Sequence, residues 1–255
     1  MNEILKVRDL TRVYGKGEAS TRALDGVSLS LTAGEYVAVM GPSGSGKTTL
    51  LNCISTIDRP TSGSIVIDGQ ELKGLRGRAL AKFRRERLGF IFQDCNLLDT
   101  LTAFENIALA LSIVKAPTTG IEKRVRETAE RLGITDCLNK YPYQMSGGQQ
   151  QRCAAARAII TKPALVLADE PTGALDSRSA RMLLDRLEEL NRDLGATILM
   201  VTHDAFTASC CRRVVFLQDG QIFQELRREG EDRRGFFQKI IQVVSQMGGE
   251  MADVL

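Results

Sequence analysis

Alternating apolar and polar positions predict strands in the early part of the chain. Residues 4–15 (ILKVRDLTRVYG) and 26–41 (GVSLSLTAGEYVAVMG) alternate, or turn continuously apolar where burial would be two-sided. Residues 64–72 (SIVIDGQEL) place Asp68-Gly69 between apolar runs, which is a hairpin signal. Residues 47–57 follow a glycine-rich turn and look helical. The pattern predicts an antiparallel N-terminal part and one strand–turn–helix unit.

Later segments follow a different period. Residues from about 100 to 160 contain three helix-like stretches with few β-branched runs, while 164–170 and 196–204 read as buried strands. Between those strands, leucines recur at helical spacing and predict a helix over 178–194. Residues 213–223 form a second Asp-Gly hairpin signal. Parallel strands that alternate with helices favour an α/β core, in which a nucleotide would lie at the carboxyl ends of the strands.

Composition narrows the class of protein. The chain has 255 residues, of which 43% are apolar and 25% charged, as in a soluble globular protein. The net charge of +3 is too mild to indicate nucleic-acid binding, and we expect no nucleic-acid partner. No apolar run approaches the roughly 20 residues that span a bilayer. The start, MNEILKVRD, has no basic region followed by an apolar one, so we expect no signal peptide.

The cysteines predict no metal or disulfide framework. Six are present without a C-x-x-C pair, and the chain has one histidine, so no zinc constellation is available. We interpret the cysteines as reduced thiols that serve as small core residues.

A complete phosphate-loop motif follows the apolar strand YVAVM. Residues 41–48 (GPSGSGKT) match G-x-x-x-x-G-K-[ST], in which glycines let backbone N–H groups curl around phosphates. We expect Lys47 to reach the β- and γ-phosphates and Thr48 to bind Mg²⁺. The predicted nucleotide-binding residues here are Gly41, Pro42, Ser43, Gly44, Ser45, Gly46, Lys47, Thr48 and Thr49.

Polar residues follow three other predicted strands. Asp169 and Glu170 end LVLADE, where Asp169 would hold Mg²⁺, through water, and Glu170 would polarise the attacking water. Two acids after a strand are by themselves usually a solvated strand end, and only the phosphate loop reverses that interpretation. His203 follows TILMVT and could donate to the γ-phosphate, although a lone histidine is more often structural. Gln93 follows LGFIF, and its amide can touch both metal and water.

Two further places suit a nucleotide. Tyr14, beside glycine in RVYGKG, could stack on a base or be an edge-strand aromatic. The stretch MSGGQQQR (145–152) looks like a second phosphate-binding helix start, with Ser146 as its cap and Gly147 and Gly148 allowing close approach. Two such helix starts in one chain are both used if they meet across two copies of it.

The ordered motifs GPSGSGKTT, Gln93, MSGGQQQR, LVLADEPTGALD and THD resemble the ATP-binding subunit of an ABC transporter over nearly the whole chain. The resemblance implies a P-loop NTPase (RecA-like) core, residues 1–93 and 160–255, with an antiparallel β sub-domain. A helical sub-domain over about 94–159 is inserted, within a single domain of 1–255. Met145 stands where the family usually has leucine, a near-isosteric change.

The same resemblance implies roles for the site residues. Two ATP molecules, with Mg²⁺, are sandwiched in a head-to-tail dimer with a second copy of the chain. Tyr14 stacks on adenine, Gln93 senses Mg²⁺ and couples to the membrane subunit, and Glu170 is the catalytic base. His203 contacts the γ-phosphate beside Lys47. Ser146, Gly147, Gly148 and Gln149 act in trans, and Asp176 lies in the loop that crosses to the other copy.

Narrower phrases point to a branch of the family. DEPTGALDS resembles lipoprotein-release, macrolide-export and cell-division ATPases, and residues 88–107 and 230–244 resemble subunits for bacitracin-type peptide resistance and sensing. The implied partners are an integral membrane permease and, through it, a sensor kinase, with the chain held peripherally at the cytoplasmic face of the membrane. The alternative is a mechanotransmission ATPase of the lipoprotein-release or cell-division type. Soluble ABC ATPases and P-loop kinases fit less well, because the former carry coiled coils or fused ATPase units and the latter need no signature helix.

Two stretches keep two interpretations each. The basic run 76–87 is a solvated helix face or a contact with acidic lipid headgroups or the membrane partner. The apolar positions within 236–244 form a core-packing face or a partner groove.

Overall fold

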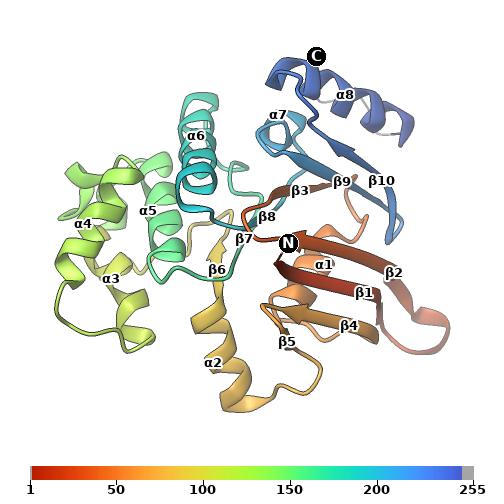
Figure 1. Ribbon diagram of the computed structural model, residues 1–255, viewed down its shortest axis with the longest axis horizontal. Coiled ribbons are helices and arrows are strands. Elements are labelled where there is room, and N and C mark those ends of the chain that lie inside the picture. The colour runs from red at the N-terminus through yellow and green to blue at the C-terminus, as the bar shows by residue number, and fades with distance from the viewer. Residues whose placement is uncertain (1, 249–255) are drawn as a thin grey trace. The chain divides into compact units, whose positions relative to one another are not determined.

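The computed structural model (Figure 1) describes residues 2–248. The chain divides into two compact units. Met1–Gly74 and Leu199–Leu255 form the first unit, and Leu75–Ile198 forms the second. The expected helical sub-domain at about 94–159 lies inside the second unit. Each unit is mixed α/β, as the alternating pattern predicts.

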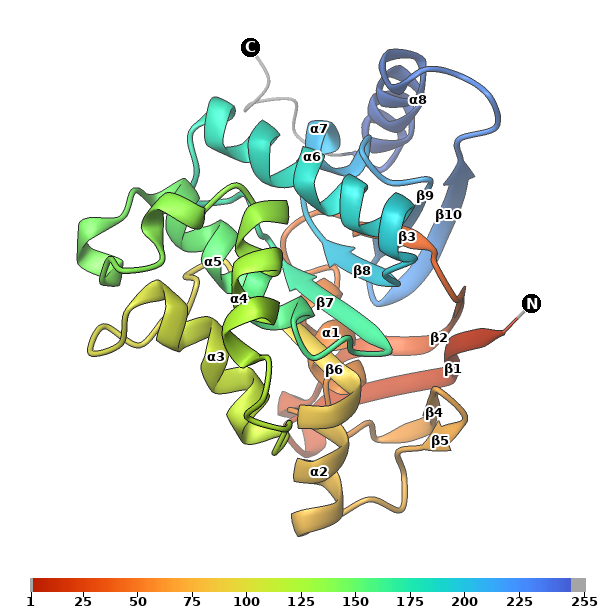
Figure 2. The ribbon, with the colours of Figure 1, turned by 60° about the vertical axis from the view of Figure 1, so that its left-hand side comes forward.

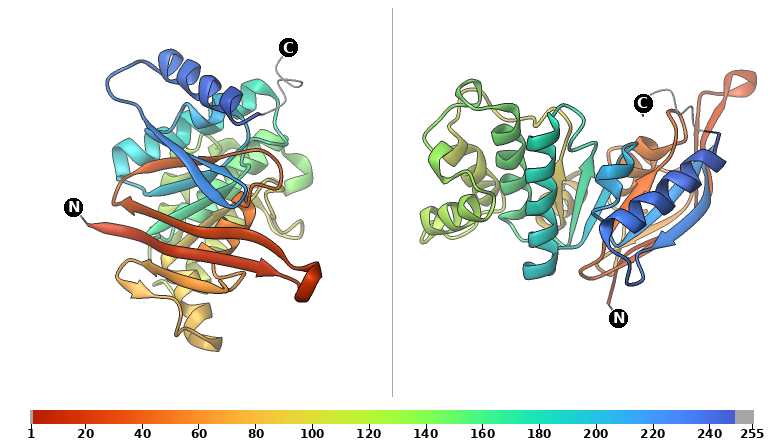
Figure 3. Two further views of the ribbon diagram at one scale, coloured as in Figure 1. Left: turned by 90° about the vertical axis from the view of Figure 1, so that its right-hand side faces the viewer. Right: turned by 90° about the horizontal axis from the view of Figure 1, so that it is seen from above.

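An antiparallel sheet of order β2-β1-β4-β5 belongs to the first unit. Its strands are β1 (Glu3–Tyr14), β2 (Thr21–Thr32), β4 (Ser62–Ile67) and β5 (Gln70–Glu71), and Figure 3 shows β1, β2 and β4 side by side. Leu5 of β1 pairs with Leu31 on one side and Ile67 on the other, and all three are fully buried. The predicted hairpin at Asp68-Gly69 is confirmed, with both residues at positive φ (48° and 75°), as a type I′ turn requires.

The first unit also contains strands in the order β10-β9-β3-β8. Here β3 (Tyr36–Met40) pairs in parallel with β9 (Arg213–Gln218), which pairs antiparallel with β10 (Gln221–Arg227). Every residue of β3 is buried, which explains its continuously apolar sequence. After β8 (Ile198–Val201), the Thr202 N–H donates to the Val39 carbonyl at 3.1 Å, so the chain ends of β3 and β8 are neighbours.

Helices of the first unit follow the strands. α1 (Lys47–Ile54) starts directly from the glycine-rich turn after β3, as predicted; α7 (Ala205–Ala208) and a 3₁₀ turn (Gly17–Ala19) are short. α8 (Arg233–Gln246) buries Phe236, Ile240 and Val243, while the neighbouring Phe237, Ile241 and Val244 stay half-buried. Core packing therefore explains one stripe of the predicted apolar face.

The second unit joins a helical cluster to two parallel strands. β6 (Leu88–Ile91) and β7 (Leu165–Asp169) pair in parallel; α2 (Gly77–Arg87) precedes β6, and α6 (Ser177–Leu194) follows β7. Between the strands come α3 (Ala103–Ile113), α4 (Ile121–Arg131), two 3₁₀ turns (Thr135–Cys137, Pro142–Gln144) and α5 (Gly147–Ile159), which Figure 2 shows in colours from yellow-green to green. Gly89 lets α5 approach β6, because a Cβ there would lie 2.4 Å from the Ala158 carbonyl oxygen. This approach fixes α5, whose N-cap is Ser146, against the strand that leads to Gln93.

The cysteine prediction is confirmed: all six are free and buried. Burial raises the pKa of Cys53 and Cys95 to about 11 and that of Cys153 to about 12, so these thiols stay protonated and unreactive at neutral pH. Within residues 2–248, no helix combines the length and apolarity that a bilayer span requires.

Candidate functional site

The turn after β3 has the geometry of a phosphate cradle. Lys47 begins α1 and is buried, and its Nζ donates to the carbonyl oxygens of Gly41 and Pro42, at 2.8 Å each. Lys47 therefore lies folded across the mouth of its own loop, at the positive end of the α1 dipole.

Glycine is required at two positions of this turn. A Cβ on Gly41 would lie 2.1 Å from the Leu217 carbonyl oxygen, and one on Gly46, where φ is 102°, would lie 2.4 Å from the Ala23 carbonyl oxygen. The Ser45 hydroxyl is buried, and no partner for it exists among the described residues. A buried hydroxyl, an ammonium group and a helix N-terminus together fit the oxygens of a phosphate chain.

His203 belongs to the same edge as this turn. It is exposed and follows β8, whose end is joined to β3 by the Thr202–Val39 hydrogen bond. The turn after β3 and His203 after β8 therefore lie at one edge of the strands of the first unit.

Tyr14 at the end of β1 has a defined orientation. The Arg12 guanidinium carbon lies 4.3 Å from the centroid of the Tyr14 ring, and the Tyr14 hydroxyl donates to Asp58. Arg12 also donates to Asp58 at 2.9 Å. The hydroxyl group of Tyr14 is held by Asp58, and the Arg12 guanidinium covers one face of the ring, so a base would stack on the other face.

The two acids after β7 differ in backbone conformation. Asp169 is the last residue of β7, while Glu170 has a φ of 43°, which is uncommon for a residue with a side chain. The Glu170 carbonyl oxygen accepts from the Gly173 N–H at 3.0 Å, so the chain turns sharply at this acid. Backbone strain of this kind is concentrated at functional sites.

Gln93 and the loop after Glu170 are in contact. A Cβ on Gly173 would lie 3.2 Å from both Cδ and Nε2 of Gln93, so the amide of Gln93 lies over this glycine. Within the second unit, Gln93 therefore contacts the loop that directly follows Asp169 and Glu170.

The helix start at Ser146 is a complete capping box. Ser146 Oγ accepts from the Gln149 N–H at 3.3 Å, and Gln149 Oε1 accepts from the Ser146 N–H at 2.9 Å. Ser146 and Gly147 are exposed, whereas Gly148 is buried. The predicted helix start at Ser146 is confirmed, and the first N–H groups of a helix have no acceptor within it. Met145 is buried, as a leucine replacement should be.

Asp176 caps α6. Its side chain accepts from the Arg178 and Ser179 N–H groups, at 3.0 Å each, and from Ser179 Oγ at 2.7 Å. These hydrogen bonds lower the pKa of Asp176, with the Ser179 N–H as the largest cause. The loop 171–176 is therefore fixed at its far end.

Two residues that no sequence pattern indicates hold the loop 92–96, here called the Gln93 loop. Gln151 Nε2 donates to the Phe92 carbonyl at 2.8 Å, and Arg157 donates to the carbonyls of Cys95 at 2.8 Å and Asn96 at 2.6 Å. Both lie on α5, more than fifty positions along the chain from the loop. No local pattern could have signalled these contacts.

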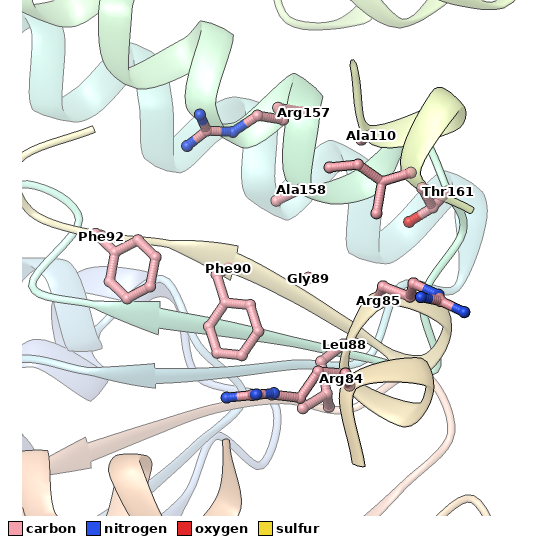
Figure 4. A pocket seen from close by; sticks show the side chains of 12 residues that line it. Arg84, Arg85, Leu88, Gly89, Phe90, Phe92, Ala110, Arg157, Ala158 and Thr161 are labelled. Carbon is pink, nitrogen blue, oxygen red and sulfur yellow. The ribbon is translucent and has the colours of Figure 1, made fainter. Parts of the chain in front are cut away.

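A groove of about 380 Å³ opens beside the Gln93 loop (Figure 4). Its apolar lining comes from β6, α2, α3 and α5, and the Phe90 and Phe92 rings are stacked with centroids 5.6 Å apart. Arg84, Arg85 and Arg157 also line it, and none of its twelve lining residues is acidic. The groove thus combines an apolar floor with positive charge.

Comparisons with known proteins agree with this arrangement. The family model described as "ABC transporter" matches residues 24–173. The "ABC transporter ATP-binding protein YxdL" of Bacillus subtilis (strain 168) is 52% identical over 254 residues, which cover 100% of this chain and 98% of that protein. The "Bacitracin export ATP-binding protein BceA" of Halalkalibacterium halodurans is 48% identical, with 98% and 99% covered.

A solved structure extends the agreement to three dimensions. It is titled "Dimeric structure of a post-hydrolysis state of the ATP-binding cassette MJ0796 bound to ADP and Pi", and is similar with a TM-score of 0.81 at 40% identity. The match covers 89% of this chain and 100% of that one. The expected P-loop NTPase fold, with its antiparallel and helical parts, is confirmed.

Proposed function

Since this chain belongs to the ABC transporter family and is an ATP-hydrolysing ATP-binding subunit, we propose that it pairs head-to-tail with a second copy and drives an integral membrane permease. ATP closes the pair, hydrolysis opens it, and the motion is passed to the permease. The chain is thereby held at the cytoplasmic face of the membrane.

The nucleotide-contacting residues divide by role. Residues 41–49 bind the phosphates, Tyr14 stacks on adenine, and His203 contacts the γ-phosphate. Glu170 accepts the proton of the attacking water. The buried Ser45 hydroxyl and the position of Lys47 support the phosphate role.

Thr48, Gln93 and Asp169 would hold Mg²⁺. Hydroxyl, amide and carboxylate oxygens are the donors this ion takes in proteins, and all three side chains are at least partly exposed. The ion would neutralise charge on the β- and γ-phosphates.

The trans role of α5 is supported by its exposed start. Ser146 and Gly147 are open to a second molecule, and the capping box has already fixed their conformation. We expect Ser146→Arg to keep nucleotide binding and to lose turnover, because its defect falls on the site of the other copy.

Mixing two inactive variants tests this trans arrangement. In a mixed dimer of Ser146→Arg and Lys47→Ala chains, one site combines an intact phosphate loop with an intact α5 start. We therefore expect the mixture to regain part of the wild-type turnover, while each variant alone stays inactive. A mixture as inactive as its components would contradict the sandwich dimer.

The groove beside the Gln93 loop supports coupling to a permease. Its stacked phenylalanines and three arginines fit a cytoplasmic permease segment that has apolar side chains and at least one acidic residue. Arg157 lines the groove and also bonds to the loop after Gln93, so a bound segment and the site share one residue. We therefore propose that Arg84 and Arg85, the two cations of the basic run that line the groove, bind the permease rather than lipid headgroups.

Charge reversal on α2 tests the docking. The double variant Arg84→Glu, Arg85→Glu should lose the permease on purification from detergent-solubilised membranes and keep ATP binding. The matched control is Arg78→Glu, Lys82→Glu, because these cations are exposed on the same helix but do not line the groove. Equal loss with both doubles would indicate lipid attraction, and no loss with either would remove the groove as the docking place.

The proposed substrate class is an antimicrobial peptide of the bacitracin kind, exported or sensed, with a sensor kinase reached through the permease. Support comes from the 48% identity to a protein named for bacitracin export. Deleting the gene should raise sensitivity to such a peptide, and Glu170→Gln expressed in its place should not restore resistance. Unchanged sensitivity together with a short, cell-division-type permease would favour mechanotransmission instead.

A further inference from the structure

Gly147 and Gly148 have different surroundings, although they are adjacent at the start of α5. Gly147 is exposed, and a Cβ added there would meet only Leu175 Cδ2, at an ordinary 3.8 Å. Gly148 is buried, and a Cβ added there would lie 2.7 Å from Ser179 Oγ and 2.8 Å from Ser179 Cβ. Real Cβ atoms do not approach other atoms this closely, so Gly148 is present because Ser179 occupies its side-chain space.

Backbone conformation does not explain the glycine at 148. The two glycines are the first two residues of α5, and neither has a positive φ. Alanine can adopt the same helical backbone, with a helix propensity at most about 1 kcal/mol more favourable than that of glycine. The backbone at position 148 would thus accept any residue, but a Cβ there would lie 2.7 Å from Ser179 Oγ. The glycine is therefore explained by the close contact between the starts of α5 and α6.

Ser179 is itself fixed. It is the third residue of α6; its N–H donates to Asp176 Oδ1 at 3.0 Å and its Oγ to Asp176 Oδ2 at 2.7 Å. Asp176 also accepts from the Arg178 N–H. The Ser179 hydroxyl cannot rotate without losing its hydrogen bond to Asp176 Oδ2, and such a rotation would leave the Ser179 Cβ beside Gly148 in any case.

We propose that Ser179 is a positioning residue, which packs into the space of Gly148 and locks the α5 start to the α6 start. Ser146 and Asp176 are the two N-cap residues to which the proposal gives a role at the other copy. With the helix starts locked, these two residues keep a fixed position relative to each other. This inference rests on the proposed function for its consequence in turnover, but the packing lock does not.

A set of substitutions at the two positions tests the lock. Gly148→Ala should lower Tm by roughly 3–8 °C, because overpacking outweighs its better helix propensity. It should lower kcat at least about tenfold with little change in KM, because a displaced Ser146 fails in the closed state only. Gly147→Ala is the control for stability and should leave Tm unchanged or higher.

Rescue separates the lock from other needs for glycine. Gly148→Ala, Ser179→Gly should regain the Tm and kcat of Ser179→Gly alone, because both close contacts disappear. Gly148→Ala, Ser179→Ala should regain little, because the contact with the Ser179 Cβ at 2.8 Å remains.

Three results would overturn the proposal: wild-type kcat in Gly148→Ala, no rescue by Ser179→Gly, or rescue by Ser179→Ala as complete as by Ser179→Gly. If the wild-type chain itself turned over no ATP, the proposed function would fail, while the coupling of the two substitutions in Tm would still report on the lock.

Discussion

Arg157→Met should loosen the loop that carries Gln93 without unfolding the protein. Arg157 holds the carbonyls of Cys95 and Asn96, and both of these residues have positive φ, 58° and 48°. Gln151 holds the other end of the loop through Phe92. α5 thus clamps a loop conformation that the chain would not adopt alone.

The magnitude follows from these contacts. Two hydrogen bonds from a charged donor contribute about 1.5–3 kcal/mol each. Release of the two left-handed residues returns about 1 kcal/mol apiece, and water replaces part of the lost bonding at this half-exposed edge. The net cost of removing Arg157 is about 1–3 kcal/mol in the free energy of opening the loop, or roughly 5- to 150-fold more opening.

Amide hydrogen exchange measures this opening directly. The Cys95 N–H donates to the Phe92 carbonyl at 3.2 Å, so its exchange reports whether the turn is closed. We expect exchange to rise by the stated factor in Arg157→Met and by less in Arg157→Lys, which keeps the positive charge but has a single donor nitrogen. The Ile134 N–H, bonded to Ala129 at 2.9 Å in a turn remote in sequence, should not change. Unchanged exchange at Cys95 in a folded Arg157→Met variant would refute the clamp.

Three further outcomes are expected. Glu170→Gln should bind ATP, trap the dimer on a gel-filtration column and lose at least about 99% of its turnover, a loss typical of removing a general base; wild-type turnover would remove Glu170 as the base. Arg213→Met should lower Tm by roughly 5–10 °C, since it leaves the Glu225 carboxylate without the guanidinium that donates to it at 2.8 and 3.0 Å. Adding Glu225→Met should recover part of that loss in the same thermal scan. Glu105 accepts hydrogen bonds from the Thr102 N–H and hydroxyl, which lower the pKa of Glu105. Because the folded-state pKa is the lower one, the advantage of wild type over Glu105→Gln should be full above the unfolded pKa and vanish as pH falls through the folded pKa, as urea titrations at several pH values would show.

Local patterns predicted the elements that depend on local chemistry. The strand–turn–helix around Lys47, the two Asp-Gly hairpins and the helix over 178–194 each carry their signal within about a dozen residues, and each is confirmed. The capping box at Ser146 was visible as a helix start for the same reason.

Contacts between distant segments were not predictable from such patterns. The sequence alone offers the same reason for both glycines of the α5 start, whereas Ser179, thirty-one positions after Gly148, separates their roles. The covering of the Tyr14 ring by Arg12 and its anchoring at Asp58 likewise depend on how β1 lies beside a later loop. Positive φ at Glu170 depends on the turn to Gly173, which no composition signal specifies.

Co-purification shows whether this ATPase works on a membrane permease. The tagged chain would be isolated from detergent-solubilised membranes of its own host, with the associated proteins identified by mass spectrometry and ATP turnover measured in the isolate. We expect one multi-span permease with a large extracytoplasmic domain to co-purify with the wild-type chain and to be lost with Arg84→Glu, Arg85→Glu. An active ATPase isolated without any membrane protein would contradict this expectation.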